Sequence, residues 1–322
     1  METRSRRSVV RSSLAMAALA VVTAVLVAAC GGGGSSSSGG TESGATEGTA
    51  AANAETVSSS APVKAPENLV SGGKITFGTD FTFPPYESIE NGEQTGFDVE
   101  VAQLLGETLG LETEMIDTRF SVLIPGLEAH HYDAILSAIY ITPERLEAVD
   151  MVPYFNTGNV MVVKEDGEYQ PKTPIEICGH KFSVNSGAFV ESVIENEVSK
   201  ECEEQGLGSI DVQVLPTETA NYEQVASGRS EVILSDTAVT AAQLAAEPQL
   251  GLHVSSAPGE LFYSTPGGIA VPKGEEELFN ALTEAVEYLE GNGKLEALRK
   301  KYALAPADTA EVKQAEAEAG GN

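Results

Sequence analysis

Between residues 74 and 302, short apolar runs rich in valine and isoleucine alternate with segments in which apolar residues recur at helical spacing. Apolar runs of four to eight residues predict strands, and one-sided apolar spacing predicts helices that cover them. Eight strands are expected, in the segments KITFGT, LETEMID, YDAILSAI, NVMVVK, FSVN, DVQVL, EVILS and GIAVP. This alternation is typical of an α/β fold with a largely parallel sheet.

The alternation falls into two series, which predicts two lobes. The first series ends near Lys164, and the second runs from Lys181 to about Val254. The later strand GGIAVPKG and two terminal helices are too small for a third core, so we expect them to return to the first lobe. The predicted boundaries are residues 71–164 plus 266–304 for lobe 1 and 165–265 for lobe 2, with hinges near 161–164 and 267–270.

The N-terminal segment has the composition of an export signal. Four arginines within residues 4–11 precede an uncharged run from Leu14 to Ala29. This run is shorter than the roughly 20 residues that span a membrane, which favours a signal peptide over residues 1–29 rather than an anchor helix. The run ends at Val27, Ala28, Ala29 and Cys30, which resembles a bacterial lipoprotein signal. The resemblance implies that Cys30 carries a lipid that holds the protein at the outer face of the membrane.

Two further segments have little to bury. Residues 30–70 are rich in glycine, serine, alanine and threonine, which predicts a flexible linker. A similar composition predicts a disordered tail over residues 305–322.

Apart from Cys30, the chain contains Cys178 and Cys202, and an exported protein meets oxidising conditions. We therefore expect these two cysteines to form a disulfide rather than a metal site or a redox pair.

Charge narrows the choice of partner. The 322 residues include 48 acidic and 19 basic side chains, a net charge of −29, so attraction to nucleic-acid phosphates is excluded. The four histidines fall outside the candidate cleft, and carboxylates are too numerous for any pair to indicate acid-base catalysis. No metal and no cofactor is predicted.

Several segments carry a family resemblance in order and spacing. They are GTDFTFPPYES, TGFDVEVAQLLGETLG, FSVLIPGLEAHHYDAILSAIYITPER, FSVNSGAFVES, EVILSDTAV and GGIAVPKG. Together they resemble the polar amino-acid-binding members of the bacterial extracellular solute-binding proteins, family 3, which serve ABC importers. The resemblance implies a type II periplasmic-binding-protein fold, in which two α/β lobes joined by two hinge strands close on a ligand. It also implies a monomeric binding protein that works with a membrane permease and catalyses no reaction, and the cysteine pair resembles a disulfide of one branch of the family.

The chemistry of an amino-acid ligand predicts the charged residues of the site. A zwitterion loses several kcal/mol of hydration per charge unless each end meets an opposite charge. Arg145 begins a predicted helix, and its guanidinium matches a carboxylate, although alone it reads as an exposed helical arginine. Asp236 follows a strand and opens a helix, so alone it reads as a helix cap. The resemblance assigns it to the ligand's ammonium group, and Asp80 to that group or to a polar side chain.

The resemblance adds uncharged residues to the site. Phe83 and Phe120 match positions whose rings enclose the ligand side chain. Two departures, Tyr140 and the pair Ala188 and Phe189, replace hydroxyl residues and predict a smaller or more aromatic pocket. The other candidates are Ser137, Ala138, Asn185 and Gly187.

Other readings stay open. Relatives on the same fold include cyclohexadienyl-dehydratase-like enzymes and ligand-sensing receptors. Asp80 and the acidic surface favour a ligand with a cationic or amide side chain over glutamate or aspartate.

Overall fold

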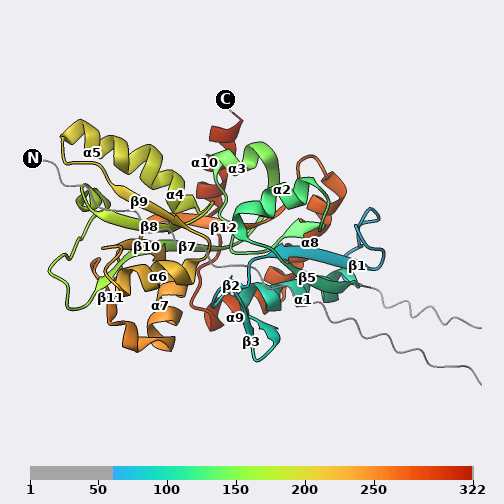
Figure 1. Cartoon of the computed structure of the whole chain (residues 1–322). Coiled ribbons are helices and arrows are strands. Elements are labelled where there is room, and N and C mark those ends of the chain that lie inside the picture. Colours follow the sequence, from blue (N-terminus) through green and yellow to red (C-terminus); the bar gives the residue numbers. More distant parts are fainter. Residues whose placement is uncertain (1–60, 321–322) are drawn as a thin grey trace, which may run out of the picture. The chain divides into compact units, whose positions relative to one another are not determined.

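The computed structural model describes residues 61–320 (Figure 1). The predicted signal peptide, Cys30, the linker up to residue 60 and residues 321–322 lie outside this range. Within residues 61–320, no helix combines the length and the apolar character that a membrane span requires.

A mixed seven-stranded sheet runs through the described part of the chain, in the order β10-β7-β12-β6-β1-β5, with β11 also paired to β7. Only β1 with β5 and β1 with β6 are parallel pairs in this sheet. The prediction of a largely parallel sheet is therefore wrong, because β7 and β12 run in opposite directions through its middle. The bounds are β1 Lys74–Thr79, β5 Glu112–Asp117, β6 Ala134–Ile135, β7 Val149–Lys164, β10 Ile233–Asp236, β11 Leu252–Val254 and β12 Phe262–Pro272.

Two smaller sheets complete the strands. Each of the eight predicted segments contains a strand, whereas the short strands β2, β3, β4 and β11 were not predicted. The bounds are β2 Thr82–Phe83, β3 Glu87–Glu90 and β4 Glu93–Thr95 in one antiparallel sheet, and β8 Lys181–Asn185 and β9 Asp211–Leu215 in a parallel pair.

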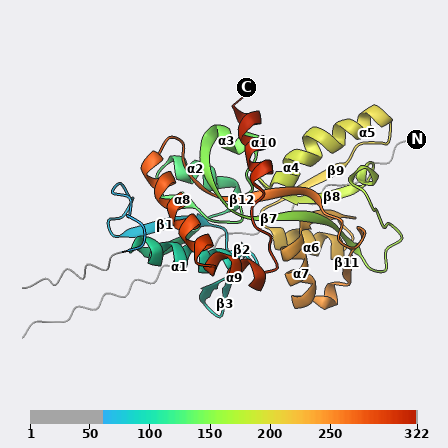
Figure 2. The ribbon, with the colours of Figure 1, turned by 180° about the vertical axis from the view of Figure 1, so that it is seen from behind.

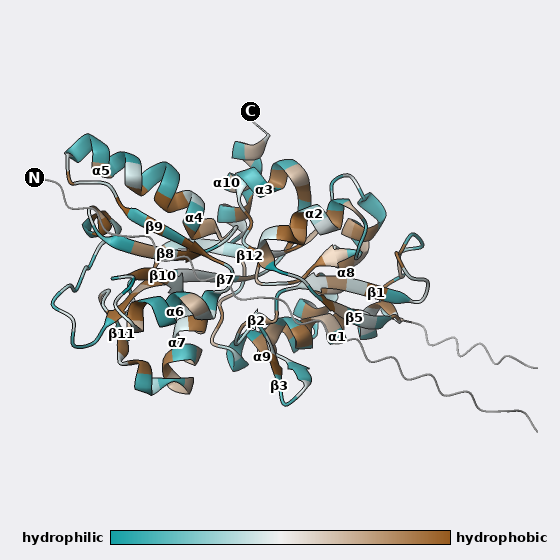
Figure 3. Cartoon of the chain, in the orientation of Figure 1, coloured by the Kyte–Doolittle hydropathy of each residue, from teal (hydrophilic) through white to brown (hydrophobic). Residues whose placement is uncertain are grey.

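Helices cover the sheets with their apolar faces. Figures 1 and 2 show α1 near β1 and β5, α8 and α9 beside α1, and α6 and α7 near β10. Figure 3 shows apolar residues on one side of these helices and polar residues on the other. The bounds are α1 Phe97–Leu109, α2 Leu123–Glu128, α3 Pro143–Ala148, α4 Phe189–Val193, α5 Ser199–Gln205, α6 Glu218–Ala226, α7 Thr237–Ala246, α8 Glu276–Gly291, α9 Lys294–Lys301 and α10 Thr309–Ala319.

Strands β7 and β12 connect two α/β lobes, as predicted. In the first lobe, residues 149–155 of β7 pair with residues 267–272 of β12. In the second lobe, residues 159–162 of β7 pair with β10, and Val162 to Lys164 pair with β11. The chain therefore crosses between the lobes near residues 156–159 and 262–267. The expected hinges at 161–164 and 267–270 are wrong, because those residues already belong to the ladders of one lobe.

The C-terminal tail is not disordered over residues 305–320. Asp308 caps the start of helix α10, and its side chain accepts hydrogen bonds from the N–H groups of Ala310 and Glu311. Val312 and Ala315 recur at helical spacing, are buried, and pack with residues of α3. The sequence prediction was wrong because two small apolar residues in an alanine- and glutamate-rich segment give only a weak signal.

The linker prediction also extends too far. Val63 is 7% exposed, and its N–H donates to the carbonyl of Thr108 in α1. The N–H of Val70 donates to a carboxylate oxygen of Asp133. Residues 61–70 therefore pack on the first lobe rather than continuing the linker to residue 70.

The predicted disulfide between Cys178 and Cys202 is confirmed. It joins the segment before β8 to helix α5, with a distance of 5.5 Å between the Cα atoms. Cys202 is fully buried in the core of the second lobe. A loop of 24 residues closed in this way stabilises the folded state by about 3 kcal/mol in the chain-entropy model.

Candidate ligand-binding site

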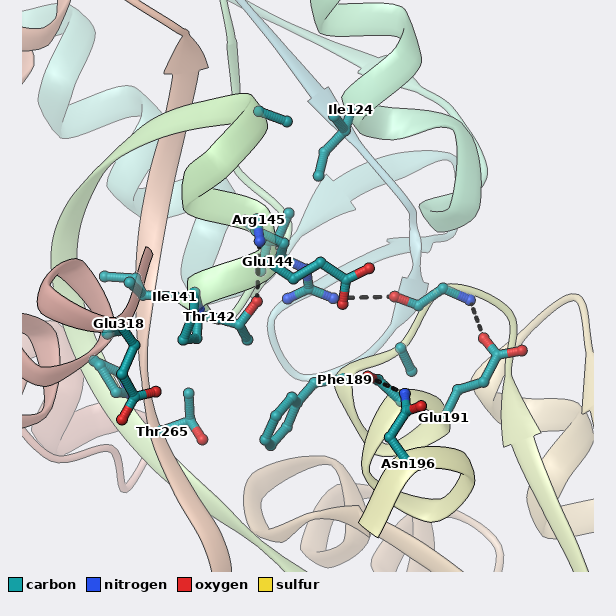
Figure 4. A pocket seen from close by; sticks show the side chains of 18 of the residues that line it. Ile124, Ile141, Thr142, Glu144, Arg145, Phe189, Glu191, Asn196, Thr265 and Glu318 are labelled. Atoms are coloured by element: carbon teal, nitrogen blue, oxygen red, sulfur yellow. Dashed lines mark hydrogen bonds between the residues drawn. The ribbon is translucent and has the colours of Figure 1, made fainter. Parts of the chain in front are cut away.

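A cavity of about 60 Å³, which we call the inner pocket, lies between residues of the two lobes. Ten of the twelve predicted ligand residues line it, namely Asp80, Phe83, Phe120, Ala138, Tyr140, Arg145, Asn185, Ala188, Phe189 and Asp236. Ser137 is buried beside Asp80 and does not line the pocket. Gly187 lines an adjoining outer groove of about 910 Å³, which shares Arg145 and Phe189 with the inner pocket (Figure 4).

Arg145 reaches the inner pocket from the start of α3. Thr142 caps this helix, and its hydroxyl oxygen accepts a hydrogen bond of 3.3 Å from the N–H of Arg145. The guanidinium donates to two carbonyl oxygens, that of Tyr140 at 2.9 Å and that of Gly187 at 3.0 Å. Its carbon lies 5.5 Å from the centre of the Phe120 ring.

The hydrogen-bond partners of the Arg145 guanidinium are neutral carbonyl oxygens. Burial lowers the pKa of Arg145 to about 10, against the opposing effect of the Glu144 charge, so the side chain is still a cation at neutral pH. A half-buried cation that bonds to neutral oxygens at a pocket wall is suited to bind a carboxylate.

Asp236 lies at the other wall, where β10 ends and α7 begins. Its Oδ1 accepts hydrogen bonds from the N–H groups of Ala238 and Val239, so it caps the helix. Its Oδ2 accepts from the hydroxyls of Tyr86 at 3.1 Å, Tyr140 at 2.8 Å and Thr157 at 2.8 Å. The sequence offers helix capping and ligand binding as alternative roles for Asp236. In the structure the residue both caps α7 and lines the pocket.

The electrostatics of Asp236 combine two opposing effects. The residue is 2% exposed, and burial raises the pKa of its carboxyl group. The hydrogen bonds from Tyr140 and Thr157 oppose this rise by stabilising the carboxylate. The hydroxyls hold a negative oxygen at the pocket wall, where it can meet a cation.

Three hydrogen bonds connect the lobes at the pocket. Tyr86 and Tyr140 of the first lobe donate to Asp236, and Arg145 donates to the carbonyl of Gly187. The ring of Tyr140 also lies 6.0 Å from that of Phe189, with an edge-on geometry. The two departures from the family pattern thus lie together in the pocket wall, and one of them bonds directly to Asp236.

Asp80 is present in the pocket, but protein groups already pair its carboxylate. Its Oδ1 lies 2.9 Å from the guanidinium of Arg119 and 2.8 Å from the hydroxyl of Thr82. Its Oδ2 accepts a hydrogen bond from the N–H of Phe120 at 2.9 Å. Sequence reasoning missed Arg119, because nothing in the local pattern shows that it faces a residue 39 positions earlier.

Four further polar residues line the inner pocket and were not predicted, namely Thr82, Asn159, Glu218 and Ser235. Glu218 begins α6 and accepts hydrogen bonds from Ser235 at 2.6 Å and Asn221 at 2.9 Å. Burial raises the pKa of Glu218. Asn159 also lines the pocket, and Thr157 contacts Asp236 from strand β7. Glu218 follows Thr217 at a helix start, so its signal in the sequence is that of an ordinary first-turn carboxylate.

A buried carboxyl pair lies behind the first-lobe wall. Glu87 accepts a 2.7 Å hydrogen bond from Ser137, and Asp98 accepts from the N–H of Ala138 at 2.7 Å and from the hydroxyl of Tyr154 at 2.8 Å. Burial raises the pKa of both carboxyl groups, and the charge of Asp98 raises that of Glu87 further. Folding therefore favours the protonated form of Glu87, and the pair accepts hydrogen bonds from Ser137 and Ala138, which follow β6.

This arrangement predicts a pH-dependent gain in stability for Glu87→Gln. Above the ordinary glutamate pKa of about 4.3, the unfolded state releases the Glu87 proton while the folded state retains it, so the wild-type free energy of unfolding falls. Glutamine does not titrate. From pH 4 to pH 7, the variant should gain at least about 1 kcal/mol relative to wild type, the scale of one pKa unit, in urea unfolding.

Glu90→Gln is the matched control for this experiment. Glu90 lies on the same strand β3 and is exposed, so its replacement should leave the pH profile of stability parallel to that of wild type. Parallel profiles for the Glu87 variant and wild type would show that Glu87 is ionised in the folded protein, contrary to our assignment.

Within residues 61–320, no group of three or more histidine, cysteine, aspartate or glutamate side chains is placed to hold a metal ion. The geometry instead offers a cation and an anion at opposite walls of one cavity.

Comparison with known proteins gives the same family as the sequence motifs. Residues 75–305 match the model of the bacterial extracellular solute-binding proteins, family 3. The chain is 29% identical over 232 residues to the L-cystine-binding protein TcyJ of Escherichia coli strain K12, covering 71% of this chain and 82% of that protein. It is 27% identical over 238 residues to the ABC transporter arginine-binding protein 1 of the same strain, covering 71% and 90%.

A solved structure agrees in fold. A mutant of ArgBP from T. maritima superposes with a TM-score of 0.64 and 32% identity, covering 71% of this chain and 95% of that one. The two lobes joined by β7 and β12 are thus the type II fold of periplasmic amino-acid-binding proteins, as predicted. The chain belongs to the bacterial extracellular solute-binding proteins, family 3.

Proposed function

We propose that this protein captures a polar amino acid outside the cytoplasm and delivers it to the membrane permease of an ABC importer. The observation that carries the proposal is that Arg145 and Asp236, of opposite charge and from different lobes, line one cavity. The cystine- and arginine-binding relatives support an amino-acid ligand. The proposed ligand residues are the twelve that the sequence predicts, with Glu218 and Asn159 added.

In this proposal, each charged wall binds one end of the zwitterion. The guanidinium of Arg145 takes the α-carboxylate, which replaces the hydration that the ligand loses. The α-ammonium group then donates to Oδ2 of Asp236, where the hydroxyls of Tyr86 and Tyr140 donate in the present structure. Because the two walls belong to different lobes, the bound ligand favours the conformation in which the lobes are close together.

The proposed location follows from the N-terminal sequence and the family. We infer that residues 1–29 direct export, that Cys30 is lipidated, and that the following linker connects a lipid anchor to the folded lobes. The lipoprotein-like run before Cys30 and the extracellular character of the family support this inference. We further propose that the protein acts as a monomer, with no nucleic-acid partner and no cofactor.

We also propose that the protein is not an enzyme. The alternatives on this fold are a cyclohexadienyl-dehydratase-like enzyme and a ligand-sensing receptor. The compared relatives are binding proteins, and this supports a transport function over both alternatives. A dehydratase of this kind would turn over a prephenate-like acid, so the two functions differ in a direct assay.

The test is a titration of the purified full chain, carrying Cys30→Ala to prevent acylation, against the twenty amino acids. Binding at a hundred times the dissociation constant stabilises the folded state by about 2.7 kcal/mol, which should raise the thermal midpoint by roughly 5 to 10 °C. A rise with a small subset of amino acids is expected. No rise with any of them, together with turnover of a prephenate-like acid, would contradict the proposal.

A further inference from the structure

Asp80 and two aromatic rings form the first-lobe end of the inner pocket. Phe83 lies on β2, which begins shortly after Asp80, and the ring of Phe120 lies beside Arg145. A ligand whose carboxylate meets Arg145 would extend its side chain along these residues. In a pocket with a free Asp80 carboxylate, a cationic side chain would be the favoured partner.

The carboxylate of Asp80 is not free. Oδ1 accepts hydrogen bonds from both the N–H and the hydroxyl of Thr82, and it also forms the ion pair with Arg119. Oδ2 accepts from the N–H of Phe120. The Arg119 guanidinium neutralises the charge of this carboxylate, whereas the donors to Asp236 are all uncharged hydroxyl and N–H groups, so Asp80 attracts a ligand cation less strongly than Asp236 does. The Asp80 side chain is 3% exposed, so water does not screen the pair on that side.

Arg119 is held in place from outside the pocket. Its guanidinium also donates to Asp117 at 2.7 Å, and the side chain is 40% exposed. It does not line the inner pocket itself. It thus neutralises Asp80 without filling the space next to the ligand, and a second cation at Asp80 would be repelled by the guanidinium.

The pocket offers uncharged partners instead. Asn185 is 7% exposed, and its Oδ1 is buried with no hydrogen-bond partner among the described residues. Asn159 donates only weakly, at 3.4 and 3.5 Å, to two carbonyl groups. A carboxamide carries both an N–H donor and a carbonyl acceptor, so it matches an unpaired acceptor and an available donor.

We propose that the Arg119–Asp80 ion pair makes this pocket select an amino acid with an uncharged amide side chain, such as glutamine or asparagine, over arginine or lysine. This inference rests on the proposed amino-acid binding. Besides Asp80 and Asp236, Glu218 lines the pocket, and its two oxygens accept hydrogen bonds from Ser235 and Asn221, so its own variant tests whether it binds a cation. The selectivity therefore differs from that of the arginine-binding relatives.

Calorimetric titration of the full chain with glutamine, asparagine, arginine and lysine tests the inference. In the wild-type protein, one of the two amides should bind at least tenfold more tightly than either cation. In Arg119→Gln, the affinity for arginine should rise about tenfold, while that for the amide changes by less than threefold. Arg119→Lys keeps the charge and should preserve the wild-type order.

Arg229→Gln is the matched control, because Arg229 is an exposed arginine of the second lobe that bonds to Gln224. It should change none of the four affinities. Arginine or lysine binding to wild type as tightly as the amides would overturn the inference, as would an unchanged ratio in Arg119→Gln. Loss of arginine binding in Glu218→Gln would assign a cation site to Glu218 instead. If none of the amino acids bound any variant, the proposed function itself would fail.

Discussion

Arg145→Gln is expected to weaken amino-acid binding by roughly a hundredfold. Removing one partner of a buried, hydrogen-bonded charge pair typically costs 2 to 5 kcal/mol, and about 2.7 kcal/mol corresponds to a factor of a hundred. The ligand carboxylate would lose its only cationic partner at the inner pocket, because Arg119 lies outside it and pairs with Asp80. Calorimetric titration with the amino acid that binds wild type most tightly measures the effect.

The same substitution should leave folding almost unchanged. The hydrogen bonds of the Arg145 guanidinium go to carbonyl groups, and burial of its charge already lowers its pKa to about 10. Losing two hydrogen bonds to carbonyl groups is offset by removing a charge that is costly to bury. Arg145→Lys keeps the charge without the planar fork and should bind with intermediate affinity. Wild-type affinity in Arg145→Gln would place the ligand carboxylate elsewhere.

Local sequence patterns were sufficient for eight of the twelve strands within residues 61–320, whereas the two charged walls also required the family resemblance. Ile75 and Phe77 on β1 are buried because an apolar run in an α/β fold lies between layers. Arg145 and Asp236 each follow a recognisable helix start, and the fold brings these two helix starts to one cavity. The prediction of their shared pocket therefore needed only local signals and the family topology.

Contacts between distant residues could not be predicted in this way. The hydroxyl of Tyr140 bonds to Asp236, which lies 96 positions away, and Arg119 pairs with Asp80 through the path of the chain after β5. Neither pair leaves a periodic signal, because each depends on the three-dimensional register of separate strands. Helix α10 escaped prediction for a different reason, since only Val312 and Ala315 mark its buried face.

These missed contacts change the interpretation of the residues that were predicted. Asp80 reads as a cation site in the sequence, but the Arg119 guanidinium neutralises it. Asp236 reads as either a helix cap or a ligand residue, but its two oxygens divide these tasks. The charge available to a ligand therefore depends on how the fold distributes donors over each carboxylate.

Asp236→Ala is expected to destabilise the protein by about 3 to 5 kcal/mol. The substitution removes the cap of α7, which contributes about 1 kcal/mol. It also leaves the hydroxyls of Tyr86, Tyr140 and Thr157 without their acceptor, and an unsatisfied buried polar group costs about 1 to 3 kcal/mol. Urea unfolding of the ligand-free protein measures the loss.

Two further variants separate the contributions of Asp236. Asp308→Ala removes the comparable cap of the exposed start of α10 and should cost only about 1 kcal/mol. Asp236→Asn retains the cap through its amide oxygen, but its NH2 group offers two donors where the carboxylate oxygen accepts from three hydroxyls, so it should lose less stability than Asp236→Ala without matching wild type. It removes the negative charge that we assign to the ligand ammonium, and affinity should fall about a hundredfold. Equal stability losses in the two alanine variants would show that the hydroxyl contacts contribute nothing. Unchanged affinity in Asp236→Asn would exclude Asp236 as the ammonium partner, because the variant has a side chain of the same shape without the negative charge.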